Sequence, residues 1–309
     1  MKNLTTWSLI MTLLSQGSSA LGSPNDHPMS LVEAREYMLS LVNRDRMANH
    51  LPKLLMDTTA SAAGQIHSDE MAQKGYISHW DTSGKKPIQR YTEAGGSDHV
   101  SENLCLVSTR VFSTEALAKQ SKPTHLFSKD ELNDLEKSFM TETPPNDGHR
   151  VQILTPEHNK VGFGLSFFVN AQNDGHLAIA QEFLNAYGRY SKLPSSIVRG
   201  RVFQVSGTFS PGVNFYSLSI YREPMPKSIS KADLNNGPRE LAYSDNAIVT
   251  YFPTDKNVKT AMVKGAQCFS VQITPDRDWQ SGLYYVSVCA VKLKRNDVIE
   301  VSTRTTSLN

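Results

Sequence analysis

The chain has 309 residues, of which 39% are hydrophobic, and its 32 Lys and Arg nearly balance its 30 Asp and Glu, for a formal net charge of +2. This near-equal number of positive and negative charges gives no indication of binding to nucleic acid or to an anionic membrane surface. The length exceeds that of a usual single domain, so we expect two domains.

The first 22 residues resemble a secretory signal peptide. Lys2 precedes a short apolar run, WSLIMTLL, and small residues follow, so that cleavage is expected after Ala20 or Gly22. The run is too short to span a bilayer, and no other apolar stretch is long enough. A disordered leader or the start of a core helix is the alternative. We expect a secreted protein, extracellular or periplasmic, with a linker at residues 23–30.

Two helices are predicted in the next segment. Ser30 and Glu33 form a capping box ahead of an apolar stripe at helical spacing. A second helix is expected from about Thr58 to Lys74, with Gly75 as its C-terminal stop. Its inward residues are expected to be Ala60, Ala63, Ile66 and Met71.

The middle of the chain is predicted to contain an insertion, a helix and two strands. Polar, irregular sequence at 105–128 reads as the insertion, and Ser128 with Glu131 forms a second capping box for the helix. Alternating stretches at 161–169 and 176–184 indicate two antiparallel strands joined by a turn.

After a linker at 191–199, residues 200–309 show only short alternating runs: VFQVSGTF, FYSLSIY, AIVTYF, CFSVQI and LYYVSVCAVKL. Such runs, separated by turn residues, predict a small β-sandwich without a catalytic motif. By analogy with sandwiches attached to other secreted domains, it would serve as a spacer or as an adhesion module that contacts envelope or glycan material.

The three cysteines allow one bridge. If CFSVQITP and GLYYVSVCAV form a hairpin, Cys268 faces Cys289, and a disulfide there would suit an oxidising compartment. Two buried thiols are the alternative. Cys105 has no partner in its own domain, so we expect it to pack as a thiol.

Four short phrases, QIHSDEM, YISHWD, VSENL and DGHRVQIL, contain His67, His79, Glu102 and His149. Their order and spacing resemble the CAP superfamily, also called the SCP domain, which includes cysteine-rich secretory proteins, antigen 5 and pathogenesis-related proteins. The His-Ser-x-x-Met helix is similar to the bacterial-type branch. The resemblance, over residues 31–190, implies an α-β-α sandwich, so the fold class expected for the whole chain is α+β.

The resemblance also implies a cleft. In the family, two histidines and two acidic residues converge, and in some members the histidines bind a divalent metal. By motif position His79 and His149 resemble the histidines and Glu102 the first acid. Glu142, three residues after Phe139, is mapped to the second. Zn²⁺ or another divalent metal is the cofactor that such a site would hold.

Three chemical interpretations of these residues remain open. Two imidazoles with a carboxylate and water could form an open Zn²⁺ site, a His/Glu acid-base pair, or a buried network that only ties loops together. His67 is expected to pack beneath the site, because it lies one helical turn from both Ala63 and Met71. Asn103 and Arg150, which directly follow site residues, are expected to hold the loops.

Three functions follow from these interpretations. The leading hypothesis is a secreted binding protein whose His/Glu cleft holds a divalent metal or a small ligand such as a lipid. The second is a metal-dependent hydrolase with Glu102 or Glu142 as the base. The third is a surface or adhesion protein with an inert CAP site. The sequence has no nucleophile elbow, phosphate-binding loop or His-Glu-x-x-His helix, so binding is preferred to catalysis.

Overall fold

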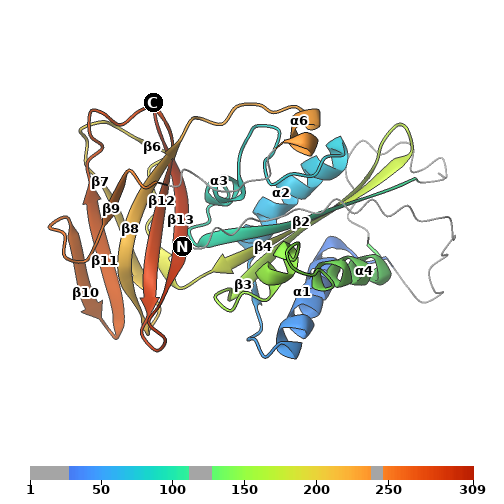
Figure 1. Ribbon diagram of the computed structural model, residues 1–309, viewed down its shortest axis with the longest axis horizontal. Coiled ribbons are helices and arrows are strands. Elements are labelled where there is room, and N and C mark those ends of the chain that lie inside the picture. Colours follow the sequence, from blue (N-terminus) through green and yellow to red (C-terminus); the bar gives the residue numbers. More distant parts are fainter. Residues whose placement is uncertain (1–27, 111–126, 238–245) are drawn as a thin grey trace. The chain divides into compact units, whose positions relative to one another are not determined.

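Figure 1 shows a computed structural model of the chain, which describes residues 28–110, 127–237 and 246–309. The predicted signal peptide at 1–22 and most of the insertion predicted at 105–128 lie outside these ranges. Within them, no helix combines the length and the apolar character needed to cross a bilayer.

The chain divides into two compact units, each built from three segments. The first comprises the described parts of Met1–Gly84, Ser101–Phe183 and Ser228–Glu240. The second comprises Lys85–Val100, Leu184–Lys227 and the described part of Leu241–Asn309. The units therefore interleave along the chain, whereas the sequence suggested contiguous domains at 31–190 and 200–309.

The first unit contains a four-stranded sheet in the order β1-β3-β4-β2. The strands are β1 (Leu55–Met56), β2 (His99–Arg110), β3 (Lys160–Val169) and β4 (Asp174–Asn185). The helices are α1 (Leu31–Ala48), α2 (Thr58–Lys74), α4 (Lys129–Met140), α5 (Gly148–Ile153) and α6 (Lys231–Asn236).

Helices cover both faces of this sheet, as Figure 1 shows for α2 on one side and for α1 and α4 on the other. Side chains of β4 alternate between the two layers. Leu177 and Ile179 belong to the core shared with α1 and α4, whereas Ala178 and Ala180 belong to the core shared with α2. The α-β-α layering implied by the family resemblance is therefore present.

The predicted helix ends are confirmed. Ser30 and Ser128 each close a capping box with a glutamate three residues on, and Gly75 ends α2 in the left-handed conformation at φ +65°. One inward residue was predicted wrongly, because Ile66 is 67% exposed. His67 takes the inward position instead, since adjacent helical side chains point about 100° apart.

Helix α2 packs unusually close to β3. A Cβ atom on Gly164 would lie 2.1 Å from the carbonyl oxygen of Gly64, so only glycine allows this approach. Because β1 pairs with only the first residues of β3, side chains satisfy the remaining edge: Gln65 Nε2 donates to the Leu165 oxygen at 2.7 Å, and Arg35 Nε to the Phe163 oxygen at 2.8 Å. This packing fixes the helix that carries His67.

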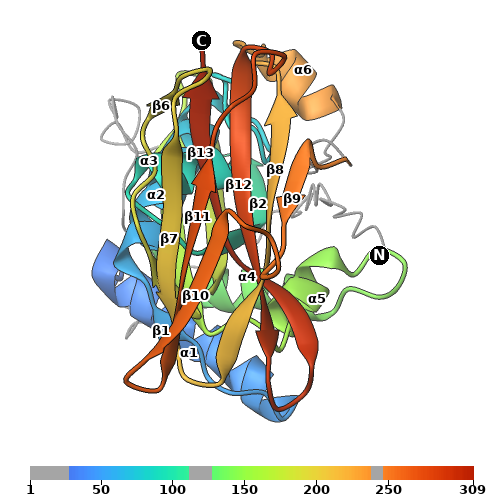
Figure 2. The ribbon, with the colours of Figure 1, turned by 90° about the vertical axis from the view of Figure 1, so that its left-hand side faces the viewer.

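The second unit contains two sheets, in the orders β10-β11-β7-β5 and β6-β13-β12-β8-β9. Its elements are α3 (Pro87–Glu93), β5 (Gly188–Tyr190), β6 (Ser196–Ile197), β7 (Phe203–Phe209), β8 (Val213–Glu223), β9 (Val249–Tyr251), β10 (Val258–Val263), β11 (Ala266–Ile273), β12 (Gly282–Lys292) and β13 (Asp297–Leu308). Figure 2 shows the two sheets one behind the other. One hydrophobic core joins them, with Val205 and Phe269 from the first sheet and Leu218 and Val286 from the second.

The strand-rich C-terminal region is thus present, but one predicted pairing is wrong. Strand β11 pairs with β7 and β10, and β12 pairs with β8 and β13, so the hairpin expected to place Cys268 opposite Cys289 does not form. The turn between these strands connects the two sheets instead. Cys268 and Cys289 are free thiols, as is the buried Cys105.

Contacts within the second unit explain why residues 85–100 belong to it. Lys86 Nζ lies 2.5 Å from Glu223 Oε1 on β8, and Ser302 Oγ on β13 donates to the Ser97 carbonyl oxygen at 2.6 Å. Both contacts join residues more than a hundred positions apart, so no local sequence pattern could reveal them.

Candidate functional site

His79 lies in the loop that follows α2, and the loop is fixed on both sides. His67 Nε2 lies 2.8 Å from the carbonyl oxygen of Ser78, and because a carbonyl only accepts, Nε2 is the donor. The Ile77 amide donates to Asn235 Oδ1 of α6 at 3.1 Å. His67 packs inward, with only 1% of its surface exposed, and it holds the residue before His79.

Glu70 holds the rest of this loop against α2. Its carboxylate accepts hydrogen bonds from Lys74 Nζ and Tyr76 OH, both at 2.6 Å, and from the Thr82 hydroxyl. Burial by itself would raise the pKa of Glu70, but the hydrogen bonds from Lys74, Thr82 and Tyr76 outweigh it and lower the pKa to about 2. Glu70 is therefore ionised at neutral pH and anchors the loop.

His79 is paired with Glu102. The His79 Nδ1 atom lies 2.8 Å from Glu102 Oε2, and both side chains are buried. Glu102 lies on β2, two residues before Leu104, which packs in the core beside α2. Because alternate residues of a strand share a face, this pair lies on the α2 side of the sheet.

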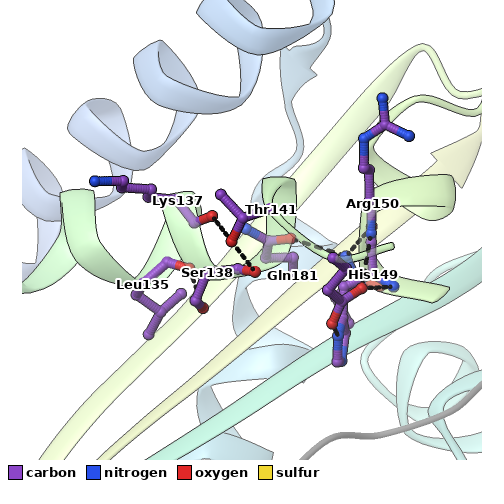
Figure 3. Close-up of polar contacts among 9 residues, drawn as sticks. Leu135, Lys137, Ser138, Thr141, His149, Arg150 and Gln181 are labelled. Atoms are coloured by element: carbon purple, nitrogen blue, oxygen red, sulfur yellow. Dashed lines mark hydrogen bonds and ion pairs between the residues drawn. The ribbon is translucent and has the colours of Figure 1, made fainter. Parts of the chain in front are cut away.

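His149, at the start of α5, is paired with Glu142, which follows α4. His149 Nδ1 lies 2.5 Å from Glu142 Oε1, while the backbone amides of His149 and Arg150 donate to Oε2 at 3.0 and 3.3 Å. The Phe139 ring stacks on the imidazole, with centroids 4.4 Å apart and planes 24° apart. Figure 3 shows His149 and Arg150 beside the end of α4. Arg150 thus contributes its backbone amide to the pair.

A buried polar network supports His149 from below. Asn103 Nδ2 donates to the His149 carbonyl oxygen at 3.0 Å and to Gln181 Oε1 at 3.2 Å, and Gln181 Nε2 donates to Glu136 Oε2 at 2.8 Å. Burial raises the pKa of Glu136 to about 8, so its carboxyl is largely protonated at pH 7. Asn103 thus hydrogen-bonds the backbone at the start of α5.

Gln181 and Glu136 were not among the residues predicted from the sequence, although a signal was present. Glu136 lies on the apolar stripe of α4, next to Leu135 and four residues after Leu132. Gln181 is a polar residue inside the apolar run of β4. A polar side chain at a core position normally has a buried hydrogen-bond partner. Here Gln181 and Glu136 are each other's partners.

The two His/Glu pairs approach β2 from opposite faces. Asn103 and Cys105 point toward the core shared with α1 and α4, and Glu102 and Leu104 toward α2. Phe139, which stacks on His149, belongs to the same core as Cys105, so the His149–Glu142 pair lies on the Cys105 side. The four predicted site residues are therefore arranged as two pairs.

The segment that carries these residues matches a known protein family. Residues 39–173 match the model of the cysteine-rich secretory protein family, CAP. The chain carries a CAP domain. All four residues of the two pairs fall within the matched range, and so do His67, Asn103 and Arg150.

Solved structures similar to this chain include two bacterial surface or extracellular proteins. An extracellular SCP-domain protein from Bacillus anthracis is 18% identical over 50% of this chain, with a TM-score of 0.34, and this chain spans 40% of its length. An outer surface protein from Borrelia burgdorferi is 15% identical over 52% of this chain and 98% of its own, with a TM-score of 0.35.

A third similar structure is a Niemann-Pick type C2 protein from the Japanese carpenter ant, 12% identical over 40% of this chain and 93% of its own, with a TM-score of 0.20. No curated protein matches the chain. Likeness at these levels of identity and TM-score says nothing about a ligand of the CAP domain.

The donor atoms of the CAP domain match a metal site only in part. Each imidazole engages a carboxylate through Nδ1, as metal-binding histidines commonly do, and His149 in addition has its Nε2 without a partner within the described residues. Catalytic Zn²⁺ sites, however, use three protein ligands. In the described ranges, no three His, Cys, Asp or Glu side chains are grouped so that they could hold a metal ion. The two pairs by themselves therefore fall short of a complete site.

Proposed function

We propose that this protein is an exported binding protein whose CAP domain receives a small ligand at His149. The observation that carries the proposal is the Nε2 atom of His149, which is buried and has no hydrogen-bond partner within the described residues. An unsatisfied buried polar atom costs roughly 1–3 kcal/mol and calls for an explanation, such as a bound ligand or water. Glu142 and Phe139 hold the ring in place for that ligand.

The tautomer of His149 defines what the ligand must offer. Glu142 accepts the proton on Nδ1, so a neutral ring presents a lone pair at Nε2. That atom accepts a hydrogen bond from a hydroxyl group, such as that of a small lipid, or ligates a divalent cation that takes its remaining ligands from water or from a ligand molecule.

A hydrolase remains the second candidate function, but the catalytic base is then a histidine and not Glu102 or Glu142. Because Glu102 and Glu142 both face the Nδ1 atom of a histidine, they are placed to orient imidazoles, and His149 Nε2 is the better-placed base. A Glu102→Gln variant that leaves a measured hydrolysis unchanged would remove Glu102 from that mechanism.

Calorimetric titration of the full chain with Zn²⁺ tests the proposal, next to a His79→Ala, His149→Ala double variant. The matched control is His50→Asn, because His50 is exposed and asparagine tolerates its positive φ of 58°. Tight one-to-one binding that only the double variant loses would identify the ligand as a metal.

A second titration with a hydroxylated lipid such as cholesterol, in detergent, covers the other ligand class. Binding of the lipid that a single His149→Ala substitution abolishes would support a hydroxyl ligand at Nε2. If the protein binds neither Zn²⁺ nor lipid, the proposal fails, and a surface protein with an inert CAP site becomes the better interpretation.

Export is proposed from the N-terminal sequence, with Lys2 ahead of an apolar run and small residues at Ala20 and Gly22. N-terminal sequencing of protein recovered outside the cytoplasm tests it. A mature chain that starts after Ala20 or Gly22 is expected, and an intact Met1 would contradict export by this route.

A further inference from the structure

The second unit contains a hollow of about 590 Å³ between β9 and the loop that joins β11 to β12. Every residue that lines it belongs to the second unit, so it is separate from the His/Glu pairs of the CAP domain. Its volume falls within the range typical of small-molecule sites.

The loop that forms one wall is held by side chains from elsewhere in the unit. Three consecutive carbonyl oxygens of this loop each accept a hydrogen bond: Trp279 from Arg199 Nε at 2.8 Å, Gln280 from Tyr284 OH at 2.6 Å, and Ser281 from Arg222 at 2.7 Å. A wall fixed in this way loses little conformational entropy when a ligand binds.

The wall combines an aromatic surface with unused polar groups. The Trp279 ring stacks on Tyr284 with centroids 5.1 Å apart and planes 7° apart, and only 8% of Trp279 is exposed. In the described part of the chain, the Trp279 indole N–H and the carboxylates of Asp276 and Asp278 have no hydrogen-bond partner. The buried polar atoms that lack a partner within the described residues do not include Trp279 Nε1, so this N–H is open to the hollow and can donate to a ligand there.

Tyr251 adds a hydroxyl from the opposite wall. Burial and the charges of Asp276 and Asp255 raise the pKa of Tyr251, so the hydroxyl stays protonated. It can both donate and accept a hydrogen bond. The hollow therefore offers acceptors at two carboxylates, a donor at the indole, and a group of both kinds at Tyr251.

We infer that this hollow binds a carbohydrate, whose hydroxyl groups pair with Asp276, Asp278 and the Trp279 N–H. A sugar matches the lining because each hydroxyl both donates and accepts. A cation would use only the carboxylates and would face the guanidinium of Arg222, while an apolar ligand would bury both carboxylates without partners. The inference does not depend on the ligand proposed for the CAP domain.

The test is calorimetric titration of the full chain with maltotriose, cellotriose, mannotriose, galactotriose and triacetylchitotriose, and separately with tetramethylammonium. Asp276→Asn and Asp278→Asn change exposed side chains and leave the core intact. Trp279→Phe keeps an aromatic ring and removes the N–H. Asp297→Asn, at an exposed position on β13, is the matched control.

At least one trisaccharide is expected to bind. Each of the three hollow variants should weaken it about tenfold or more, because each removes a hydrogen bond to the ligand, and the control should leave it unchanged. The inference is overturned if no trisaccharide binds, if the hollow variants bind as well as the parent chain, or if only tetramethylammonium binds.

Discussion

His67 and Ser78 are joined by a buried hydrogen bond, 2.8 Å from the imidazole Nε2 to the carbonyl oxygen, and this bond ties α2 to the residue before His79. Both residues are buried, so water cannot replace the bond if it is lost. The orientation of His79 toward Glu102 therefore depends on the hydrogen bond by which His67 holds Ser78, the residue before His79.

A His67→Leu substitution keeps an apolar body in the core and leaves the Ser78 carbonyl oxygen unpaired. We expect the free energy of unfolding to fall by roughly 1–3 kcal/mol in urea denaturation, since a buried acceptor loses its donor. Hydrogen exchange of amides in residues 76–82 should accelerate. The exposed His50→Asn variant should show neither change, and unaltered exchange in His67→Leu would rule out a positioning role.

Glu70 makes the same loop sensitive to acid. Its pKa is lowered from 4.5 to about 2, so the unfolded chain binds the proton more readily than the folded one. The stability that Glu70 contributes is present above pH 4.5 and is lost as the pH falls toward 2. Glu70→Gln should therefore lower the Tm at pH 7 and reduce its decline below pH 4.5. A Tm profile parallel to that of the parent chain would contradict this prediction.

Glu136 has the opposite pH dependence. Burial raises its pKa from 4.5 to about 8, so the folded state holds a proton that the unfolded state has released. Its contribution is complete below pH 4.5 and declines steadily as the pH rises toward 8. Glu136→Gln keeps an acceptor for Gln181 and should raise the Tm at pH 8 more than at pH 5. Asp134→Asn, exposed on the same helix, should change neither value.

Neighbouring lysines test the attachment of residues 85–100 to the second unit. The Lys86–Glu223 pair is 2.5 Å long with side chains 8% and 19% exposed, whereas the Lys85–Glu93 pair is 34% and 47% exposed. Lys86→Ala should cost roughly 3 kcal/mol, because it leaves Glu223 without its cation, while Lys85→Ala should cost less than about 1 kcal/mol. Urea denaturation with hydrogen exchange in β12 and β13 provides the measurement, and equal losses would show that the segment is not anchored there.

Pairing within the CAP domain could be predicted only in part. The phrases around His79, Glu102 and His149 identified three of the paired residues, and their family resemblance supplied Glu142. The arrangement as two pairs on opposite faces of β2 depends on the strand alternation between Glu102 and Asn103 together with the packing of α2 and α4. The network through Gln181 and Glu136 was missed. In the sequence each is a single polar residue within an apolar pattern, and only the fold brings the two side chains together.

The sequence by itself determined the caps of α1 and α4, the end of α2 at Gly75, and most strands of the second unit, because these depend on residues a few positions apart. Only the tertiary structure decided which strands pair: β11 and β12 follow each other in the chain, yet they lie in different sheets and keep Cys268 and Cys289 apart. It also placed residues 85–100 in the second unit. Strand pairing and domain membership depend on contacts between segments that are distant in the sequence. Such contacts produce no local periodicity from which they could be predicted.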